Sequence, residues 1–266
     1  MSRPRVYKTE AVVLGGTRLG EADRLVTLYT QRRGKVRAVV RGALRPRSRL
    51  GGHIQPLTHC HLMLAVGKGL DVVTGCQILN PSIPLREDLV YQARGFYLME
   101  LIDNFCPEGL ENRALFSLLV DTLEHLCLSE GGERVLRRFE VRLLDITGFR
   151  PELHRCLGCH QALEPVTNYL SLSAGGLLCP PCAPEQPPVH SLSVNAVKVL
   201  RLLQEADMET VNRLKLAPGL AAELEAALKG YIQFVLERRI KSGVWLERLR
   251  RELGPNGSLG GPQNGR

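Results

Sequence analysis

Hydrophobic and polar residues alternate with a period of two along the first eighty residues, a pattern typical of strands that bury one face. Glycine-containing turns interrupt this alternation at Gly15-Gly16, Gly34, Gly51-Gly52 and Gly67-Lys68-Gly69. The expected strands are Tyr7–Gly15, Arg24–Tyr29, Lys35–Arg41, Thr58–Val66 and Asp71–Gln77. Five short strands predict a small closed barrel, most commonly of the oligonucleotide-binding (OB-fold) type, although an SH3-like barrel fits the pattern almost as well.

After Pro81 and Pro84 the hydrophobic period changes to the 3.6 residues of an amphipathic helix. Asn112 and Ser193 suit helix N-caps, and Pro151 suits a helix end. The expected helices are Asp88–Phe105, Asn112–Leu128, Glu133–Thr147, Ser193–Ala206 and a longer one after Pro218, which we expect to break at Ser242-Gly243.

The two periodicities together predict an α+β chain with several domains. The barrel should occupy residues 1–80, and an all-α domain should follow in two parts, residues 81–152 and 191–253. A cysteine- and proline-rich segment, residues 153–190, is inserted between these parts. Residues 254–266, GPNGSLGGPQNGR, have almost nothing to bury, so we expect a disordered tail.

Four cysteines in the insert have the spacing of a zinc site. Cys156 and Cys159 form one C-x-x-C pair, Cys179 and Cys182 form another, and 19 residues separate the pairs. Each pair can direct two thiolates at one ion, and four thiolates would complete a closed tetrahedral shell around one structural Zn²⁺. Two alternatives are a redox pair at Cys179 and Cys182 and buried apolar thiols. Both are less favoured, because prolines rather than a helix follow the second pair, and because doubled pairs are typical of zinc.

Positive charge is concentrated in the predicted barrel. The net charge is +8, but residues 1–80 hold 14 Lys and Arg against only four acidic residues. No acidic residue lies between Lys35 and Asp71, and the stretch Gly34–Arg49 is the most basic of the chain. A charge run is often only a solvated surface. A one-signed cluster on a folded strand and its loop nevertheless favours binding to phosphates.

Membrane and catalytic functions find little support in the sequence. No apolar run approaches the length of a membrane span, and MSRPRVYKTE differs from a secretory leader. Eight cysteines without such a leader suggest a reducing cytosol, so we expect a cytoplasmic protein without membrane partners. The sequence shows neither a phosphate-binding G-x-x-x-x-G-K-[ST] loop nor a G-x-S-x-G nucleophile. We therefore expect no catalytic residues and no enzymatic activity.

Short motifs spread over most of the chain occur in a familiar order. They are Thr9–Leu14, Gly20–Val26, Thr30 with Gly34–Val36, Arg41-Gly42, Ser48–Leu50, Phe139-Glu140, Leu143-Leu144, Gly148-Phe149, and Gly175-Gly176 ahead of Cys179 and Cys182. From about Val6 to Leu249 the chain resembles the RecO family of DNA repair proteins, and within it the zinc-bearing branch.

This resemblance implies an OB-fold barrel, a helical domain and a zinc knuckle. It also implies a recombination mediator that is not an enzyme. Separately, we expect the chain to be monomeric when alone. Such proteins bind single- and double-stranded DNA and anneal complementary strands without ATP. Together with the partner RecR, they help to load recombinase onto strands coated by single-stranded-DNA-binding protein. The expected location is the cytoplasm, in association with the nucleoid.

The composition of the predicted barrel suggests which residues contact DNA. Residues 1–80 contain only two aromatic residues, Tyr7 and Tyr29, so base stacking should be minor. We expect backbone charge to hold the DNA, with a log–log salt slope of about −3.5 if about five phosphates are neutralised. The expected DNA-binding residues are Arg18, Lys35, Arg37, Arg41, Arg45, Arg47 and Arg49.

A second site is implied for the acidic C-terminal tail of the single-stranded-DNA-binding protein. Arg134, Arg137, Arg138 and Arg142 share an arc of one predicted helix beside Phe139, which would offer cations and apolar surface. A solvated helix face explains the same arginines equally well. Two other functions stay open: a zinc-containing scaffold whose barrel docks an acidic protein, and a zinc-containing RNA-binding factor.

Overall fold

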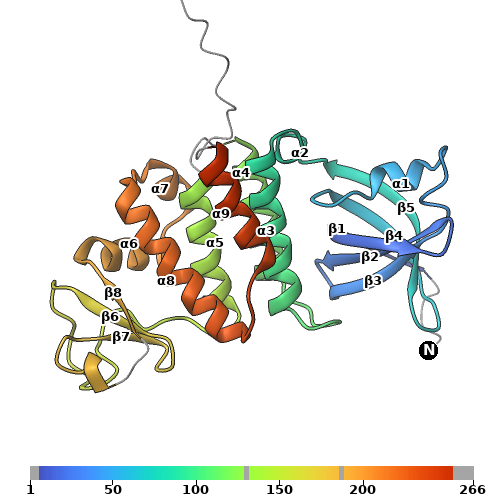
Figure 1. Cartoon of the computed structure of the whole chain (residues 1–266). Helices are drawn as coiled ribbons and strands as arrows, with labels where there is room; N and C mark the ends of the chain where they lie inside the picture. The colour runs from blue at the N-terminus through green and yellow to red at the C-terminus, as the bar shows by residue number, and fades with distance from the viewer. Residues whose placement is uncertain (1–5, 129–131, 186–188, 254–266) are drawn as a thin grey trace, which may run out of the picture. The chain divides into compact units, whose positions relative to one another are not determined.

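The computed structural model describes residues 6–128, 132–185 and 189–253 (Figure 1). The expectation of a disordered tail at 254–266 therefore lies outside the described residues. The chain divides into two compact units: residues 1–130 with 240–266 form unit 1, and residues 131–239 form unit 2. These boundaries do not coincide with the expected ones at residues 80 and 190, because the helices within residues 84–128 and the last helix group with the barrel.

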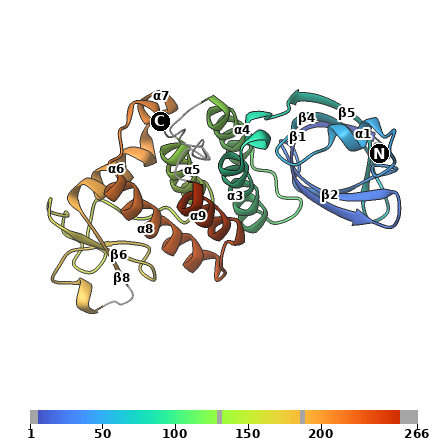
Figure 2. The same cartoon turned by 45° about the horizontal axis from the view of Figure 1, so that its top comes forward.

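Five strands close into a barrel in unit 1, and they form a ring in Figure 2. They are β1 (Val6–Leu19), β2 (Asp23–Thr30), β3 (Gly34–Val40), β4 (His59–Ala65) and β5 (Asp71–Asn80). Their order around the barrel is β1-β2-β3-β5-β4, and β4 pairs with β1. All neighbours are antiparallel except β3 and β5, which pair in parallel through Ala38 with Asp71 and Val39 with Val72.

The alternation predicted for these strands explains the barrel core. Every second residue points inward, so Ala11 and Val13 of β1 meet Val26 and Leu28 of β2 in one buried cluster. The expected strands are confirmed, although β1 extends four residues and β5 three residues beyond their expected ends.

One short helix in the barrel was not expected. α1 (Arg49–His53) lies between β3 and β4 in the chain, and the Ser48 side chain accepts from the Gly51 amide at its start. An added Cβ at Gly51 would overlap the carbonyl oxygen of Ala43. Gly51-Gly52 therefore belongs to a helix that packs closely on the preceding loop, and not to a free turn.

Four helices complete unit 1: α2 (Pro84–Glu87), α3 (Leu89–Phe105), α4 (Arg113–Leu128) and α9 (Lys241–Leu253). The carboxylate of Glu100 in α3 accepts from the backbone amides of Lys241 and Ser242, at 2.9 and 2.7 Å. This carboxylate satisfies amides at the start of α9, where helices lack internal partners.

Unit 2 contains α5 (Gly132–Ile146), α6 (Val194–Glu205), α7 (Met208–Arg213) and α8 (Pro218–Leu236). A small antiparallel sheet of order β7-β6-β8 joins β6 (Asn168–Ser171), β7 (Gly176–Leu178) and β8 (Val189–Leu192), with one 3₁₀ turn at Ala183–Glu185. The expected helices at α3, α4, α5, α6 and α8 are confirmed.

The expected helix break at Ser242-Gly243 is wrong in position. α8 ends at Leu236, and its C-cap residue Glu237 has a left-handed φ of 52°, which ends the helix about five residues earlier. Within the described ranges, no helix is long and apolar enough to cross a membrane.

Candidate nucleic-acid interface and metal site

The loop after β3 presents four exposed cations. Arg41, Arg45, Arg47 and Arg49 are all exposed, and none forms an ion pair with another residue that the structure describes. The start of the loop is held by the Asp23 carboxylate, whose Oδ1 accepts from the Gly42 amide at 2.8 Å. We call residues 41–49 the basic loop. It consists of turns that lead into α1, and it carries four arginines that have no acidic partner among the described residues.

Arg18 occupies a different position, near the end of β1. Its Nε donates to the carbonyl of Gly20 at 3.0 Å, and its Nη2 donates to the carbonyl of Glu21 at 3.3 Å. These bonds fold the exposed side chain onto the β1–β2 turn. Both acceptors are neutral carbonyl groups, so these bonds do not offset the positive charge of the guanidinium.

Lys35 and Arg37, which were expected to face DNA, are already paired with acidic residues. Lys35 Nζ lies 3.0 Å from Asp103 Oδ1, and only 14% of its side chain is exposed. Arg37 Nε lies 2.7 Å from Glu108 Oε1, and half of the Arg37 side chain is exposed. Sequence patterning gave no sign of these partners, because they lie about 70 residues further along the chain.

The paired carboxylates belong to one segment that lies along β3. The amide of Gly109 donates to the carbonyl of Lys35 at 2.9 Å, and Lys35 and Glu108 form a parallel bridge. Gly34 at the start of β3 has φ +58°, and a Cβ there would overlap the carbonyl oxygen of Leu110. We call residues 103–110 the strap. It covers the first part of β3, on the edge that pairs with β5 only from Ala38 onward.

The β2–β3 turn carries two exposed arginines that the sequence reasoning missed, Arg32 and Arg33. The guanidinium carbon of Arg33 lies 3.7 Å from the centroid of the Tyr7 ring. The Tyr7 hydroxyl in turn donates to Asp71 Oδ2 at 2.6 Å. A signal was present in the sequence, because both arginines directly precede Gly34, a turn residue between two predicted strands.

The four cysteines of the insert come together as predicted. Their Sγ atoms all lie within 4.8 Å of one another, and Cys159 Sγ lies 3.8 Å from Cys179 Sγ. A tetrahedral zinc site with Zn–S bonds of about 2.3 Å requires sulfur atoms about 3.8 Å apart. They are the one group of three or more metal-ligating side chains among the residues that the structure describes.

The surroundings of Cys156 favour the thiolate that a metal needs. The amides of Gly158 and Cys179 each donate to its Sγ at 3.3 Å. Burial raises the pKa of the Cys156 thiol, but backbone N–H groups lower it by more, and the pKa falls to about 6. The donor set and its geometry therefore fit one metal ion with four sulfur ligands.

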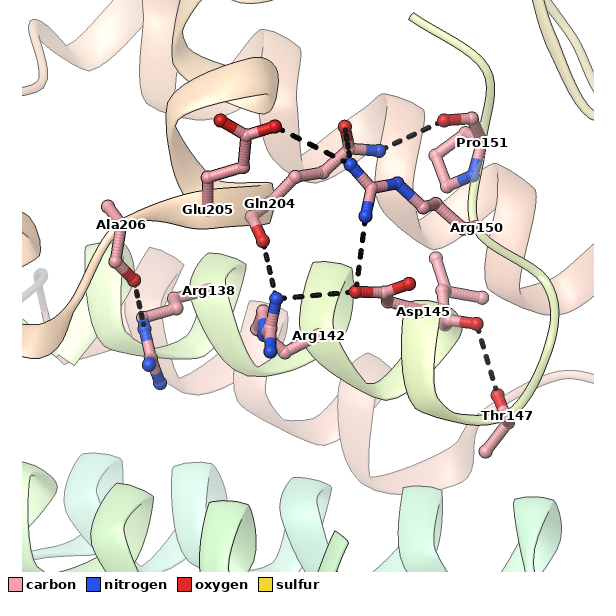
Figure 3. A network of polar contacts seen from close by, with 10 residues as sticks. Arg138, Arg142, Asp145, Thr147, Arg150, Pro151, Gln204, Glu205 and Ala206 are labelled. Carbon is pink, nitrogen blue, oxygen red and sulfur yellow. Dashed lines mark hydrogen bonds and ion pairs between the residues drawn. The ribbon is translucent and has the colours of Figure 1, made fainter. Parts of the chain in front are cut away.

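The arginines of α5 are engaged inside unit 2 (Figure 3). Arg142 donates to the carbonyl of Gln204 at 2.6 Å and pairs with Asp145, and Arg138 donates to the carbonyl of Ala206 at 3.2 Å. Those carbonyls lie at the end of α6, where helices lack internal partners and attract cations. Both arginines therefore stabilise the end of α6.

Other members of the expected tail-binding group are buried. Phe139 has no exposed surface, and Arg137 is only 3% exposed and lies 3.1 Å from Glu140. The expectation that Phe139 offers apolar surface to a partner is wrong, because α5 turns this ring into the core. Arg134 is partly exposed, so the structure does not assemble the five residues into one surface.

These features define a class: multidomain proteins with a basic five-stranded barrel, a helical part and a cysteine cluster of the metal-binding type. The description "Recombination protein O N terminal" matches residues 1–82, and "Recombination protein O C terminal" matches residues 86–243. The chain therefore belongs to the RecO family.

Named relatives agree over nearly the whole chain. A DNA repair protein RecO of Dehalococcoides mccartyi (strain 195) is 39% identical over 94% of this chain and 99% of the relative. One from Roseiflexus sp. (strain RS-1) is 40% identical over 94% of this chain and 88% of the relative. One from Desulforamulus reducens is 34% identical over 92% of this chain and 95% of the relative.

Proposed function

We propose that this chain is a recombination mediator in DNA repair. It binds single- and double-stranded DNA through the barrel and anneals complementary strands without ATP. With RecR it helps to load recombinase onto strands coated by single-stranded-DNA-binding protein. Membership of a family named for recombination and DNA repair supports this role. We further propose that it has no catalytic step of its own and works in the cytoplasm.

The basic loop is the observation that carries the proposal. Four exposed arginines, none of them paired with an acidic side chain that the structure describes, lie on this loop, and such clusters attract phosphates. The strand order, with a helix between β3 and β4, supports a barrel of the oligonucleotide-binding type. If these four arginines each neutralise one phosphate, the log–log salt slope on single strands is about −2.8.

Charge neutralisation also explains annealing. Two complementary strands repel each other through their phosphates, and a bound patch of arginines reduces that repulsion at the point of contact. Base pairing then proceeds without any group on the protein that makes or breaks a covalent bond. The activity therefore depends on the density of unpaired cations and decreases as salt increases.

We propose zinc as the ion held by the four cysteines, because thiolate sulfur at tetrahedral spacing is the usual ligand set of structural zinc. A full shell of four thiolates leaves no position for a substrate. The ion would hold the two C-x-x-C turns together around the small buried cluster of Cys156, Leu178 and Ala183. Its proposed role is to stabilise this part of unit 2.

RecR and the acidic tail of single-stranded-DNA-binding protein are proposed as partners from the family relation alone. Because Phe139 and Arg137 are buried, no binding surface on α5 is part of this proposal. Two other partner classes, an acidic protein and RNA, would use the same basic loop, so the experiment must separate them from DNA.

The test mixes two complementary single strands, precoated with single-stranded-DNA-binding protein, without ATP. Faster pairing with this protein, weakened by salt and by R45E with R47E, supports the proposal. The matched control is K215E with R239E, which makes the same charge change at two exposed positions of unit 2.

Loss of annealing in both variants would contradict a site on the basic loop. RNA bound in preference to DNA would favour an RNA-binding factor. No DNA binding at low salt would refute the proposal.

A further inference from the structure

We propose that Arg33, held against Tyr7, is a stacking platform for one nucleobase of single-stranded DNA. This inference rests on the proposed function and adds a base contact to a site so far described by charge alone. It replaces the expectation that stacking is minor because aromatic residues are scarce. The stacking surface is a guanidinium group, which no count of aromatic residues can reveal.

The lower layer of the platform is fixed by the barrel. The Tyr7 ring packs against the buried barrel cluster, and its hydroxyl donates to Asp71 Oδ2 at 2.6 Å. The two residues belong to β1 and β5, so the hydrogen bond joins two strands that are not neighbours in the barrel. The ring cannot turn without breaking this bond and leaving the cluster.

The upper layer is held by the turn that carries it. The amide of Arg33 donates to Thr30 Oγ1 at 3.1 Å, and the same hydroxyl donates to the carbonyl of Gly34 at 2.9 Å. The guanidinium carbon lies 3.7 Å from the Tyr7 centroid, which is van der Waals contact. The Arg33 side chain is nevertheless exposed, so the guanidinium remains accessible to a ligand from solvent.

No acidic side chain among the described residues forms an ion pair with Arg33. This distinguishes it from Lys35 and Arg37, which are paired with the strap. The other barrel aromatic residue, Tyr29, has no exposed surface and cannot meet a base. Among the described residues of the barrel, Arg33 is therefore the exposed arginine whose guanidinium lies over an aromatic ring.

The chemistry of single strands suits this arrangement. Unpaired bases stack on aromatic rings and on arginine guanidinium planes, and such stacking tolerates any base. A guanidinium that stacks on a base still has N–H groups at its edge for the adjacent phosphate. In a duplex the bases are already stacked on one another, so the platform should strengthen the binding of single strands only.

The experiment compares a single-stranded oligonucleotide with the same strand made abasic, by fluorescence anisotropy with the full chain. The phosphates are the same, so the affinity ratio reports base contacts. We expect the wild type to favour the base-containing strand about fivefold or more. R33K keeps the charge and loses the plane, so the ratio should fall to near one while duplex affinity stays the same. R32K is the matched control on the same turn, and its ratio should equal that of the wild type.

The outcomes separate this inference from the proposed function. A wild type that binds DNA in a salt-dependent way, with no preference for base-containing strands, overturns the platform and leaves the mediator proposal intact. A preference that persists unchanged in R33K also overturns it. No binding to any DNA at low salt overturns both. Thermal melting of R33K, expected to match the wild type closely, excludes unfolding as the cause of a lower ratio.

Discussion

Replacing Glu108 with glutamine should tighten DNA binding. In the wild type, Arg37 Nε lies 2.7 Å from Glu108 Oε1, and both side chains are about half exposed. The Glu108 carboxylate forms the ion pair with Arg37 that a DNA phosphate would otherwise form. The amide of glutamine keeps the size of the side chain but removes the charge, so Arg37 becomes available to DNA.

The expected gain follows from the exposure of this pair. Ion pairs between exposed side chains contribute about 0.2–1 kcal/mol. Removing that competition should therefore tighten binding by a factor of up to about five. One further phosphate contact should also make the log–log salt slope on single strands steeper by about 0.7. The free energy of unfolding should fall by at most about 1 kcal/mol.

The assay is a series of anisotropy titrations on single-stranded DNA between low and physiological salt. E111Q is the control, because Glu111 is on the same loop and pairs with Arg113 rather than with a barrel cation. Equal gains in E108Q and E111Q would show a general effect of net charge and refute the competition between strap and DNA. Weaker binding by E108Q would show that the strap positions Arg37 for DNA.

Three further predictions concern the fold. Serine in place of any one of the four cysteines should abolish stoichiometric zinc, measured by elemental analysis as a loss from one ion per chain. G34A should lower the free energy of unfolding, measured by denaturant titration, by more than about 2 kcal/mol. Gly34 has a left-handed φ, and a Cβ there would overlap the strap. G52A is the control, because a Cβ at Gly52 meets nothing within 4 Å. Burial lowers the pKa of His59 from its usual 6.5, and Glu10 partly offsets this effect. The unfolded state therefore binds the proton more readily than the folded state. The free energy of unfolding should decrease as the pH falls below about 6.5. H59Q should melt with less dependence on pH between 7.5 and 5.5 than H61Q; equal dependence in both would contradict this assignment.

The sequence predicted the elements of this fold better than their partners. Strand alternation and helical stripes depend on neighbours within a few residues, so the five strands and five long helices could be predicted. α1 was missed because Gly51-Gly52 disfavours a helix locally, and only close packing on the loop before it explains the conformation. The short helix α7 was missed as well.

The candidate sites show the same division. The cysteine cluster was predictable, because two C-x-x-C pairs fix most of the geometry by themselves. The partners of Lys35 and Arg37 were not, because the strap meets β3 only in the folded barrel. Amphipathic patterning placed Phe139 on the apolar stripe of α5 but could not show that this stripe is fully covered.

The division of unit 1 in the sequence has a consequence for synthesis on the ribosome. Residues 131–239 separate α4 from α9, so all of unit 2 emerges before the helix that completes unit 1. Until then the Phe96 ring lacks Trp245, whose centroid lies 6.2 Å away, and Glu100 lacks the amides that it caps. At about 5–20 residues per second, the roughly 150 residues after α3 take about 7–30 s to make. For that time α3 lacks the helix that packs against it in the finished unit, so the contacts that join the two ends of unit 1 form only after its last residues are made.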